Sequence, residues 1–289
     1  MSEYYLASGF ALGELARTRS AGPLLAWARE IADKAPAEDI YRNKEGRKTL
    51  RFEYRGKPYF LKLHSGIGWL EIAKNLLQLR LPVVSASTEY HAVLALQRAG
   101  VYTMTIGAYA RKGWNPAAVR SMIVTAELTG TTSLEDYCAN WATVPPAPDV
   151  RIRLIRAVAG IAQRMHRAGV NHRDFYLCHF HLDELSLQEP ELRCYLIDLH
   201  RAQTRGQVPR RWQVKDLAGL YFSAMDCGLE RRDLLRFLRH YSAGGLRSAL
   251  GPERELWEQV EGRARDLYQK AHGARPTSTA IQELQGDRG

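Results

Sequence analysis

The change in hydrophobic period along the chain constrains its fold more than any other feature. Apolar and polar residues alternate over residues 49–63, and the turn sequence RGKP divides this stretch in two, which predicts a β-hairpin. Over residues 150–168, apolar residues instead recur every three or four positions, which predicts a long amphipathic helix ended by Gly169. Further helical patterns follow it. We therefore expect a β-rich first part and a mainly helical second part.

A lysine lies in the second strand of the predicted hairpin, within YFLKLH. Its apolar neighbours at alternate positions share one face, which leaves Lys62 on the other face, where it needs an acidic partner. Two helices are predicted next, over residues 65–84 and 88–99. Glu71 lies in the first of them and Glu89 near the start of the second. We expect Glu89 to be the partner and Glu71 to be its rival.

Two aspartates follow in the second part of the chain. The stretch VNHRDFYLCHF comes directly after the long helix, and RCYLIDLHR further on predicts a short strand that ends in an aspartate. Four charged residues are thus predicted in a fixed order along the chain: Lys62 on a strand, Glu89 on a helix, Asp174 on a loop and Asp198 at the end of a strand.

This order resembles that of protein kinases. In those enzymes the strand lysine contacts the α- and β-phosphates and pairs with the helix glutamate, the loop aspartate accepts the hydroxyl proton, and the second aspartate holds Mg²⁺. The resemblance implies an α+β, bilobal fold with a small β-rich N-lobe and a larger, mainly helical C-lobe. We place the N-lobe at residues 38–128 and the C-lobe at 129–272, after an N-terminal extension over 1–37 and before a flexible tail over 273–289.

Three positions differ from the protein-kinase pattern. His179 stands five residues after Asp174, where an asparagine usually binds the second Mg²⁺. The Asp-Phe-Gly triplet is replaced by Asp198-Leu199-His200. The segment RNKEGRKT, expected to cover the phosphates, has one glycine, Gly46, whose neighbouring backbone amides are expected to approach the phosphates.

These differences, together with longer motifs, resemble one family closely: the lipopolysaccharide core heptose(I) kinases of Gram-negative bacteria. The resemblance covers about residues 40–270 and rests on EGRKTLR, YFLKLHSGIGWLEIAKNLLQLRLPV, TEYHAVLAL, AGVNHRDFYLCHF, LIDLHRAQTR and RRWQVKDLAGLYFSA. It implies ATP- and Mg²⁺-dependent phosphorylation of the first heptose of the inner core. It also implies the lipopolysaccharide core as partner, at the cytoplasmic face of the inner membrane.

The resemblance implies a role for each candidate site residue. Asp174 would orient the heptose hydroxyl and accept its proton, and Asp198 would bind Mg²⁺, with His179 as a candidate second ligand. The residues expected to bind ATP are Lys62, Glu89, Gly46, Glu127 and Leu128, the last two through their backbone. The residues expected to brace the catalytic loop are His172, Arg173 and Asp216.

Four arginines follow Asp198 in the chain, where an acceptor lies in kinases: Arg201, Arg205, Arg210 and Arg211. Guanidinium groups bind phosphates and carboxylates in a forked geometry, so we expect these residues to contact the acidic groups of the core oligosaccharide. The alternative is a solvated basic loop.

The charge balance favours acidic partners. The chain has 41 Lys and Arg against 31 Asp and Glu, a formal net charge of +10. We expect a lipopolysaccharide, an anionic membrane surface or an acidic protein, and no nucleic acid, because no recognition helix, finger or RNP pattern occurs. The apolar segment 66–83 either packs within the N-lobe or contacts lipid. No eighteen apolar residues occur in succession, so no membrane span is indicated. The resemblance implies a cytoplasmic protein that is peripheral at the inner membrane.

Three alternatives stay open. A zinc site is one of them, although its candidate ligands lack paired zinc spacing: His172, Cys178, His179, His181, Cys194 and His200. The second is another phosphotransferase of the same fold that acts on a small molecule or a protein. The third is a non-catalytic basic scaffold, which the retained lysine and aspartates oppose.

Overall fold

The computed structural model describes residues 2–10, 15, 17–44, 46–77 and 83–274. The chain divides into two compact units. The first comprises Met1–Val93 and Met104–Thr129, and the second comprises Leu94–Thr103 and Gly130–Gly289. The first unit is rich in strands and the second is mainly helical, as the hydrophobic pattern predicts, and residues 275–289 of the predicted tail lie outside the described residues.

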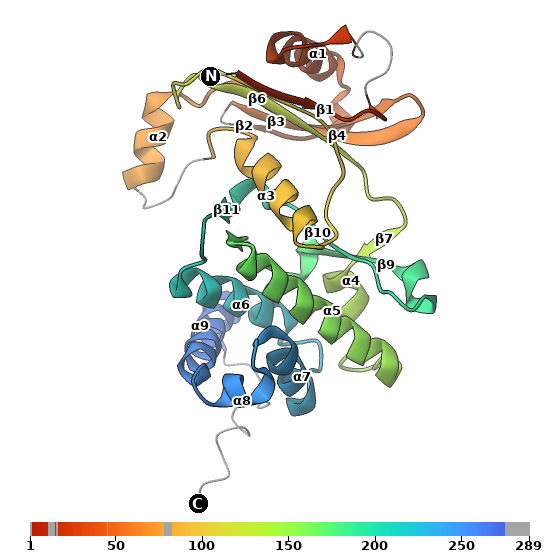
Figure 1. Cartoon of the computed structure of the whole chain (residues 1–289), viewed down its shortest axis with the longest axis vertical. Coiled ribbons are helices and arrows are strands. Elements are labelled where there is room, and N and C mark those ends of the chain that lie inside the picture. The colour runs from red at the N-terminus through yellow and green to blue at the C-terminus, as the bar shows by residue number, and fades with distance from the viewer. Residues whose placement is uncertain (1, 11–14, 16, 45, 78–82, 275–289) are drawn as a thin grey trace, which may run out of the picture. The chain divides into compact units, whose positions relative to one another are not determined.

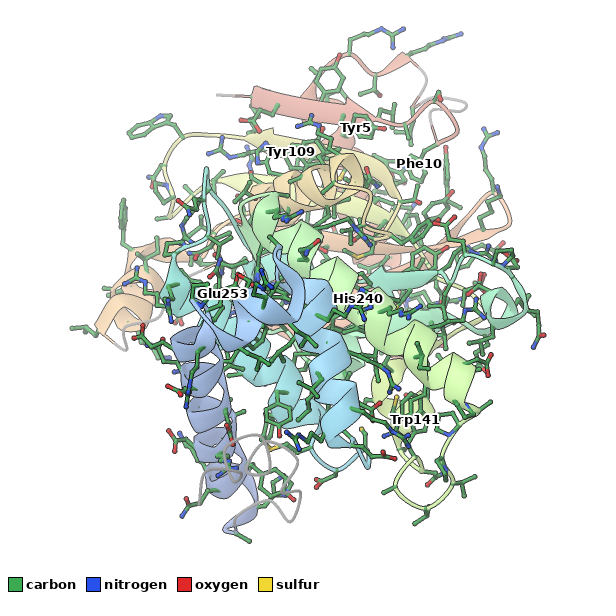
Figure 2. All side chains as sticks on the ribbon, turned by 60° about the horizontal axis from the view of Figure 1, so that its bottom comes forward. Tyr5, Phe10, Tyr109, Trp141, His240 and Glu253 are labelled. Atoms are coloured by element: carbon green, nitrogen blue, oxygen red, sulfur yellow. The ribbon has the colours of Figure 1, made fainter. Side chains whose placement is uncertain are left out.

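The first unit is built on a six-stranded antiparallel sheet (Figure 1). Its strand order is β1-β5-β6-β4-β3-β2. The strands are β1 (Ser2–Leu6), β2 (Ile40–Lys44), β3 (Arg47–Tyr54), β4 (Lys57–His64), β5 (Ile106–Lys112) and β6 (Arg120–Ala126). Strand β1 was not predicted; it pairs with β5, where Tyr5 lies opposite Tyr109 (Figure 2).

The predicted hairpin is the pair β3 and β4. Its two-residue turn places Arg55 at φ 55° and Gly56 at φ 72°, the left-handed conformations that a tight hairpin of this twist requires. Leu50 and Leu61 lie opposite each other in the register, and both are fully buried. Because side chains alternate between the two faces of a strand, Lys62 points to the other face.

Helix α1 (Ala21–Lys34) covers the apolar face of this sheet. Its Leu24 and Ala28 join Leu50 and Leu61 in the core of the first unit. Residues 1–37, expected to be an extension, thus supply both a strand and a covering helix to this unit.

Two more helices follow β4. Helix α2 (Gly68–Leu77) lies within the stretch 65–84 that the pattern predicts to be helical. Residues 78–82 of the segment 66–83, which was expected either to pack within the N-lobe or to contact lipid, lie outside the described residues. The second helix, α3 (Ser87–Arg98), carries Glu89 in its first turn, and Gly100 follows it at φ 68°, a conformation that suits a glycine.

The helices of the second unit surround one apolar core. They are α4 (Leu134–Cys138), α5 (Pro148–Arg167), α6 (Arg210–Ala224), α7 (Arg231–Tyr241), α8 (Gly245–Leu250) and α9 (Arg254–His272). The long helix predicted over 150–168 is α5. Among the described residues, no helix combines the length and the apolar character that a membrane crossing requires.

Short strands and 3₁₀ turns shape the loops of the second unit. The strands are β7 (Thr131–Ser133), β8 (Val170–Asn171), β9 (Phe180–Asp183), β10 (Cys194–Leu196) and β11 (Gln203–Thr204). Among the residues that the structure describes, the 3₁₀ turns are η2 (Ala37–Asp39), which lies in the first unit, and η3 (Leu177–His179), η4 (Glu184–Gln188) and η5 (Leu199–Arg201) in the second. Gly169 enters β8 at φ 73°, and a Cβ at this position would lie 1.8 Å from the Arg205 carbonyl oxygen, so only glycine fits.

Candidate active site

The structure brings Lys62 and Glu89 together in the first unit. Lys62 Nζ donates to Glu89 Oε1 at 2.7 Å, and the carboxylate is buried. Removing one member of a buried charge pair leaves the other without compensation, which costs far more than loss of a surface pair. The rival Glu71 lies 3.8 Å from Lys74 Nζ on its own helix. Lys62 of β4 is thereby held in place by Glu89 of helix α3.

Gly46 lies in the turn between β2 and β3, at φ 67°. A Cβ here would lie 2.2 Å from the Gly66 carbonyl oxygen, and the Gly46 carbonyl accepts a hydrogen bond from the Ser65 amide at 2.8 Å. The turn therefore rests directly on the backbone that follows β4, and only glycine permits this approach.

Glu127 follows strand β6. Its side chain accepts from Arg51 Nε at 2.8 Å, and its amide donates to the Pro58 carbonyl at 3.1 Å. The carboxylate and the amide of Glu127 are therefore both engaged within the first unit.

Asp216 of α6 holds the backbone of the loop that contains Asp174. Its fully buried carboxylate accepts from the amides of His172 at 2.7 Å and Arg173 at 2.8 Å. Arg173 has φ 77°, a conformation that a non-glycine residue adopts only when its surroundings enforce it. These two charge-assisted bonds supply that enforcement. His166, which the sequence did not single out, lies 3.5 Å from the same carboxylate.

His172 links this loop to the strand that leads to Asp198. The ring is fully buried, and Nε2 lies 2.8 Å from the Ile197 carbonyl oxygen, which accepts only, so Nε2 carries the proton. Burial lowers the pKa of the imidazole, although the Asp216 carboxylate acts in the opposite direction. His172 is therefore a neutral brace, and Ile197 directly precedes Asp198.

The carboxylate of Asp174 pairs with Arg201, which the sequence analysis assigned to the acceptor instead. Arg201 Nη1 lies 2.8 Å from Oδ1 and 3.0 Å from Oδ2 of the Asp174 carboxylate. We expected Arg201 to bind the acceptor, and the pairing with Asp174 had no signal in the sequence. The remaining N–H groups of the guanidinium leave it able to bind an anion at the same time.

Two histidines flank the Asp198 carboxylate. His200 Nδ1 lies 2.7 Å from Oδ1, and His179 Nε2 lies 3.7 Å from Oδ2. His179 Nδ1 also lies 2.6 Å from the Asp174 carbonyl oxygen, which only accepts, so Nδ1 donates and Nε2 is the ring nitrogen that faces Asp198. His179 therefore lies between the backbone of Asp174 and the carboxylate of Asp198.

Two of the remaining predicted arginines contact the ring of Trp212 of α6. The guanidinium carbons of Arg205 and Arg211 lie 5.8 Å and 5.4 Å from the centroid of its ring. Arg173 and Lys215 lie on the same ring at 5.3 Å and 5.4 Å. We call these four cations with Arg201 the cationic cluster. Arg210 instead pairs with Glu255 at 3.3 Å and does not join it.

Repulsion within the cationic cluster affects its members. Burial, followed by the charges of neighbouring arginines, lowers the pKa of Lys215 and of Arg173. An anion bound beside these cations would relieve the repulsion between them. Neither Trp212 nor Lys215 was predicted from the sequence.

The zinc alternative lacks a geometric basis. Among the described residues, no group of three or more His, Cys, Asp or Glu side chains is arranged to hold a metal ion. The four cysteines are free, and burial raises the pKa of the Cys194 thiol to about 12.

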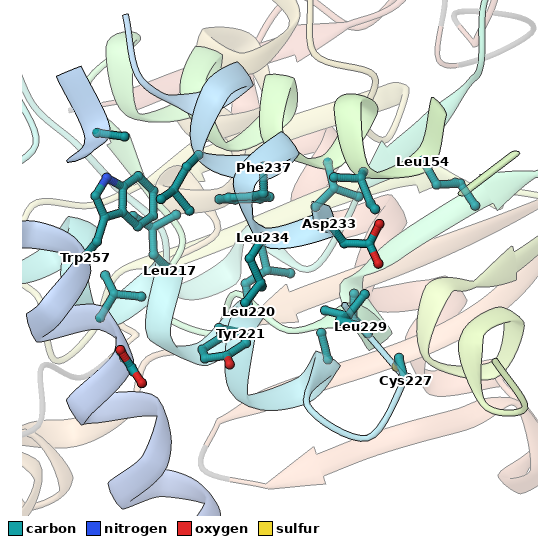
Figure 3. Close-up of a pocket in the computed structure, with 18 of the residues that line it drawn as sticks. Leu154, Leu217, Leu220, Tyr221, Cys227, Leu229, Asp233, Leu234, Phe237 and Trp257 are labelled. Carbon is teal, nitrogen blue, oxygen red and sulfur yellow. The ribbon is translucent and has the colours of Figure 1, made fainter. Parts of the chain in front are cut away.

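An apolar cavity of about 420 Å³ lies among the helices of the second unit. Figure 3 shows Leu217 and Leu220 of α6, Leu234 and Phe237 of α7, and Trp257 of α9 around it. The interior of a folded protein rarely leaves a space of this size among leucine and aromatic side chains, so the cavity suits an apolar ligand.

Comparison with known proteins identifies the family. The model of the lipopolysaccharide kinase (Kdo/WaaP) family matches residues 33–241. A lipopolysaccharide core heptose(I) kinase WaaP from Pseudomonas aeruginosa is 51% identical over 233 residues, which cover 80% of this chain and 87% of the relative. A protein of the same name from Escherichia coli is 50% identical, with 80% and 88% covered.

A solved structure of WaaP in complex with acyl carrier protein is also similar. It matches with a TM-score of 0.75 and 41% identity, over 92% of this chain and 99% of that one. The predicted protein-kinase-like α+β fold is confirmed. The chain belongs to the lipopolysaccharide kinase (Kdo/WaaP) family, and as a kinase it is a phosphotransferase that uses ATP.

Proposed function

We propose that this protein transfers a phosphoryl group from ATP to the first heptose of the lipopolysaccharide inner core. The relatives named lipopolysaccharide core heptose(I) kinase, at 50% and 51% identity, support this acceptor. The observation that carries the proposal is the arrangement of Asp174, His179 and Asp198 in one unit, in which His179 Nδ1 lies 2.6 Å from the Asp174 carbonyl oxygen and His179 Nε2 lies 3.7 Å from Asp198 Oδ2. Phosphoryl transfer needs a group that orients the hydroxyl and a separate group that holds a cation.

Asp174 is the group that orients the heptose hydroxyl and accepts its proton. Arg201 holds both carboxylate oxygens, which fixes the direction in which the carboxylate points. Positioning a proton acceptor in this way removes orientational freedom before the reaction. Arg201 is therefore a positioning residue for Asp174 and also a contact for the acceptor.

The ATP phosphates are bound by Lys62, which the buried Glu89 keeps extended and charged. The backbone around Gly46 covers the phosphates, and the backbone of Glu127 and Leu128 binds the adenine. The engaged amide of Glu127 leaves its carbonyl to accept from the adenine amino group.

Asp198 and His179 are the residues that hold Mg²⁺. Asp198 Oδ2 lies 3.7 Å from His179 Nε2, so these two side chains would hold the cation together. His179 also donates its other ring nitrogen to a backbone carbonyl, as metal-binding histidines commonly do. When bound, Mg²⁺ neutralises charge on the phosphate oxygens.

The cationic cluster around Trp212 binds the phosphates and acidic sugars of the core oligosaccharide. Its members lie in the same unit as Asp174, and Arg201 belongs to both groups of contacts. An antibiotic kinase needs an acidic surface for its cationic substrates, so the cluster favours an anionic saccharide over that class of acceptor.

The experiment is phosphorylation of purified lipopolysaccharide that lacks the heptose phosphate, with ATP and Mg²⁺. We expect a mass increase of one phosphate on the core oligosaccharide. A panel of aminoglycosides, small sugars and protein substrates runs beside it. Phosphorylation of one of these, with an unchanged lipopolysaccharide mass, would assign the protein to another class of phosphotransferase.

The lipid-anchored acceptor places the reaction at a membrane, so we propose a peripheral position at the cytoplasmic face of the inner membrane. Membrane fractionation with and without a salt wash tests it. Release by salt is the expected result for a basic peripheral protein.

An acyl carrier protein is the acidic protein partner that we propose. The related WaaP structure in complex with acyl carrier protein supports it, and the apolar cavity of the second unit suits the acyl chain of such a carrier. Val158→Trp fills the cavity and is expected to weaken binding of acylated carrier, measured by calorimetry, while binding of the unacylated carrier stays the same. Equal affinities of wild type and variant for acylated carrier would remove the cavity from the proposal.

A further inference from the structure

Helix α2 exposes most of its apolar side chains. Leu70 is 90% exposed, Leu77 is 87% exposed and Trp69 is 61% exposed. Among the side chains of α2 that the structure describes, Ile72 alone is buried. An exposed apolar patch of this kind marks a surface that binds something other than water. The sequence left open whether the segment 66–83 packs within the N-lobe or contacts lipid. In the structure, few of the described side chains of α2 pack into the first unit.

A second exposed aromatic residue lies beside this helix. The turn between β5 and β6 carries Trp114, which is 82% exposed. The same turn accepts a hydrogen bond from the start of α2, since the Gly68 amide donates to the Ala117 carbonyl at 3.0 Å. Figure 1 shows α2 beside the end of the sheet at which β5 and β6 are joined. Trp114 and the apolar residues of α2 therefore lie at the same end of the first unit.

Cations lie at the base of this turn. Lys112 and Arg120 face each other across β5 and β6, and together with Arg29 of α1 they line a pocket of about 300 Å³. All three side chains are exposed. Within the described part of the chain, none of the three forms an ion pair with a carboxylate. Their charge is therefore available to an external anion.

We propose that these residues form a membrane-binding surface for anionic phospholipid, made of Trp69, Leu70, Leu77 and Trp114 with Arg29, Lys112 and Arg120. Tryptophan and leucine enter the boundary between head groups and acyl chains, and the adjacent cations bind the lipid phosphates. The choice of a membrane over another anionic partner rests on the lipid-anchored acceptor proposed above.

Other exposed apolar residues do not share this setting. Leu185 in the second unit is 78% exposed, and Val144 and Leu250 of that unit are exposed as well, but each stands alone in a different segment. Single exposed leucines are normal on protein surfaces. Leu185 therefore provides a matched control for loss of an exposed leucine outside the proposed surface.

The test is sedimentation of the full-length protein with vesicles. Wild type is expected to bind vesicles of phosphatidylethanolamine and phosphatidylglycerol, and to bind phosphatidylcholine vesicles weakly. Because burial of a leucine changes an equilibrium by about tenfold or more, L70S and L77S are each expected to weaken binding about tenfold, as is W114S. Lys112→Gln with Arg120→Gln is expected to weaken binding to anionic vesicles and to flatten its salt dependence.

The control variant L185S is expected to bind as wild type does. Since all substituted side chains are exposed, thermal unfolding midpoints stay the same and report that the variants fold. The proposal is overturned if wild type does not bind anionic vesicles, or if L70S, L77S and W114S bind them as tightly as L185S.

Phosphorylation of a deacylated, water-soluble core oligosaccharide separates this inference from the proposed enzyme activity. The surface variants are expected to retain wild-type activity on that acceptor. If the protein binds vesicles but phosphorylates neither acceptor, the proposed function is contradicted and the membrane-binding surface is supported. If it phosphorylates an acceptor but does not bind vesicles, the membrane-binding surface is contradicted and the proposed function is supported.

Discussion

Arg201 Nη1 donates to both carboxylate oxygens of Asp174, at 2.8 Å from Oδ1 and 3.0 Å from Oδ2. The pairing joins the proposed proton acceptor to the segment that follows the proposed metal ligand.

Substitution of Arg201 therefore affects the chemical step. Arg201→Gln removes both contacts, and we expect kcat to fall about 10- to 100-fold, since loss of one aligned charged group commonly has an effect of this size. The KM for ATP is expected to change little. Steady-state kinetics with Arg210→Gln as control tests this, because Arg210 pairs with Glu255 instead. A fall in kcat as large in the control would deny Arg201 a specific role.

His179 is expected to set the metal requirement. Asparagine at this position restores an oxygen ligand of the kind that Mg²⁺ prefers, so His179→Asn retains activity. His179→Ala is expected to raise the Mg²⁺ concentration for half-maximal activity about tenfold or more. A titration of activity against Mg²⁺ provides the measurement. An unchanged Mg²⁺ dependence in His179→Ala would exclude His179 as a ligand.

Asp216 is expected to be needed for the shape of the catalytic loop. In the wild type, the Asp216 carboxylate accepts hydrogen bonds from the backbone amides of His172 and Arg173. In Asp216→Asn, the side-chain NH₂ group would face one of these two donors. We expect a loss of about 1–3 kcal/mol in the free energy of unfolding, together with a fall in kcat. Urea unfolding measures the first quantity. Asp266→Asn, at an exposed position of α9, is the control, and equal stability of the two variants would contradict the proposed role.

The buried His172 is expected to make stability depend on pH. Burial lowers the pKa of this imidazole in the folded protein, whereas in the unfolded chain it titrates near 6.5. Below about pH 6.5 the unfolded state therefore binds more protons than the folded state. The free energy of unfolding keeps its maximal contribution from His172 above that pH and decreases as the pH falls toward the folded pKa. Burial also lowers the pKa of His181 and His240, which add to the decline.

Unfolding midpoints between pH 8 and about pH 5 test this linkage. His172→Gln keeps a donor near the Ile197 carbonyl but does not titrate, so its midpoint is expected to fall less steeply with acid. His91→Gln, at an exposed position of α3, is expected to follow wild type. Identical slopes for His172→Gln and wild type would contradict the assignment.

Local patterns of the sequence predicted the hairpin of β3 and β4, because alternation over eight residues is enough to define the face on which Lys62 lies. The contact of Asp216 with the loop was predicted from the resemblance to kinases, and not from a local pattern. Strand β1 was not, since its pairing depends on β5, about a hundred residues further on.

The pairing of Arg201 with Asp174 and the gathering of cations on Trp212 depend on how loops and α6 meet in space. A basic run in a sequence has the same appearance whether it is solvated or folded around a ring, so the sequence predicted the arginines but not their partners. The exposure of α2 is a similar case: helical periodicity predicted the helix, but burial depends on whether another element covers it.

Transfer by Asp174→Asn to lipopolysaccharide that lacks the heptose phosphate tests the central assignment most directly. Wild type is expected to add one phosphate to the first heptose, located by NMR of the product. Asp174→Asn is expected to lower kcat about 100- to 10,000-fold, the range that a positioned proton acceptor contributes. Full transfer by Asp174→Asn, or a phosphate on a different sugar, would contradict the account.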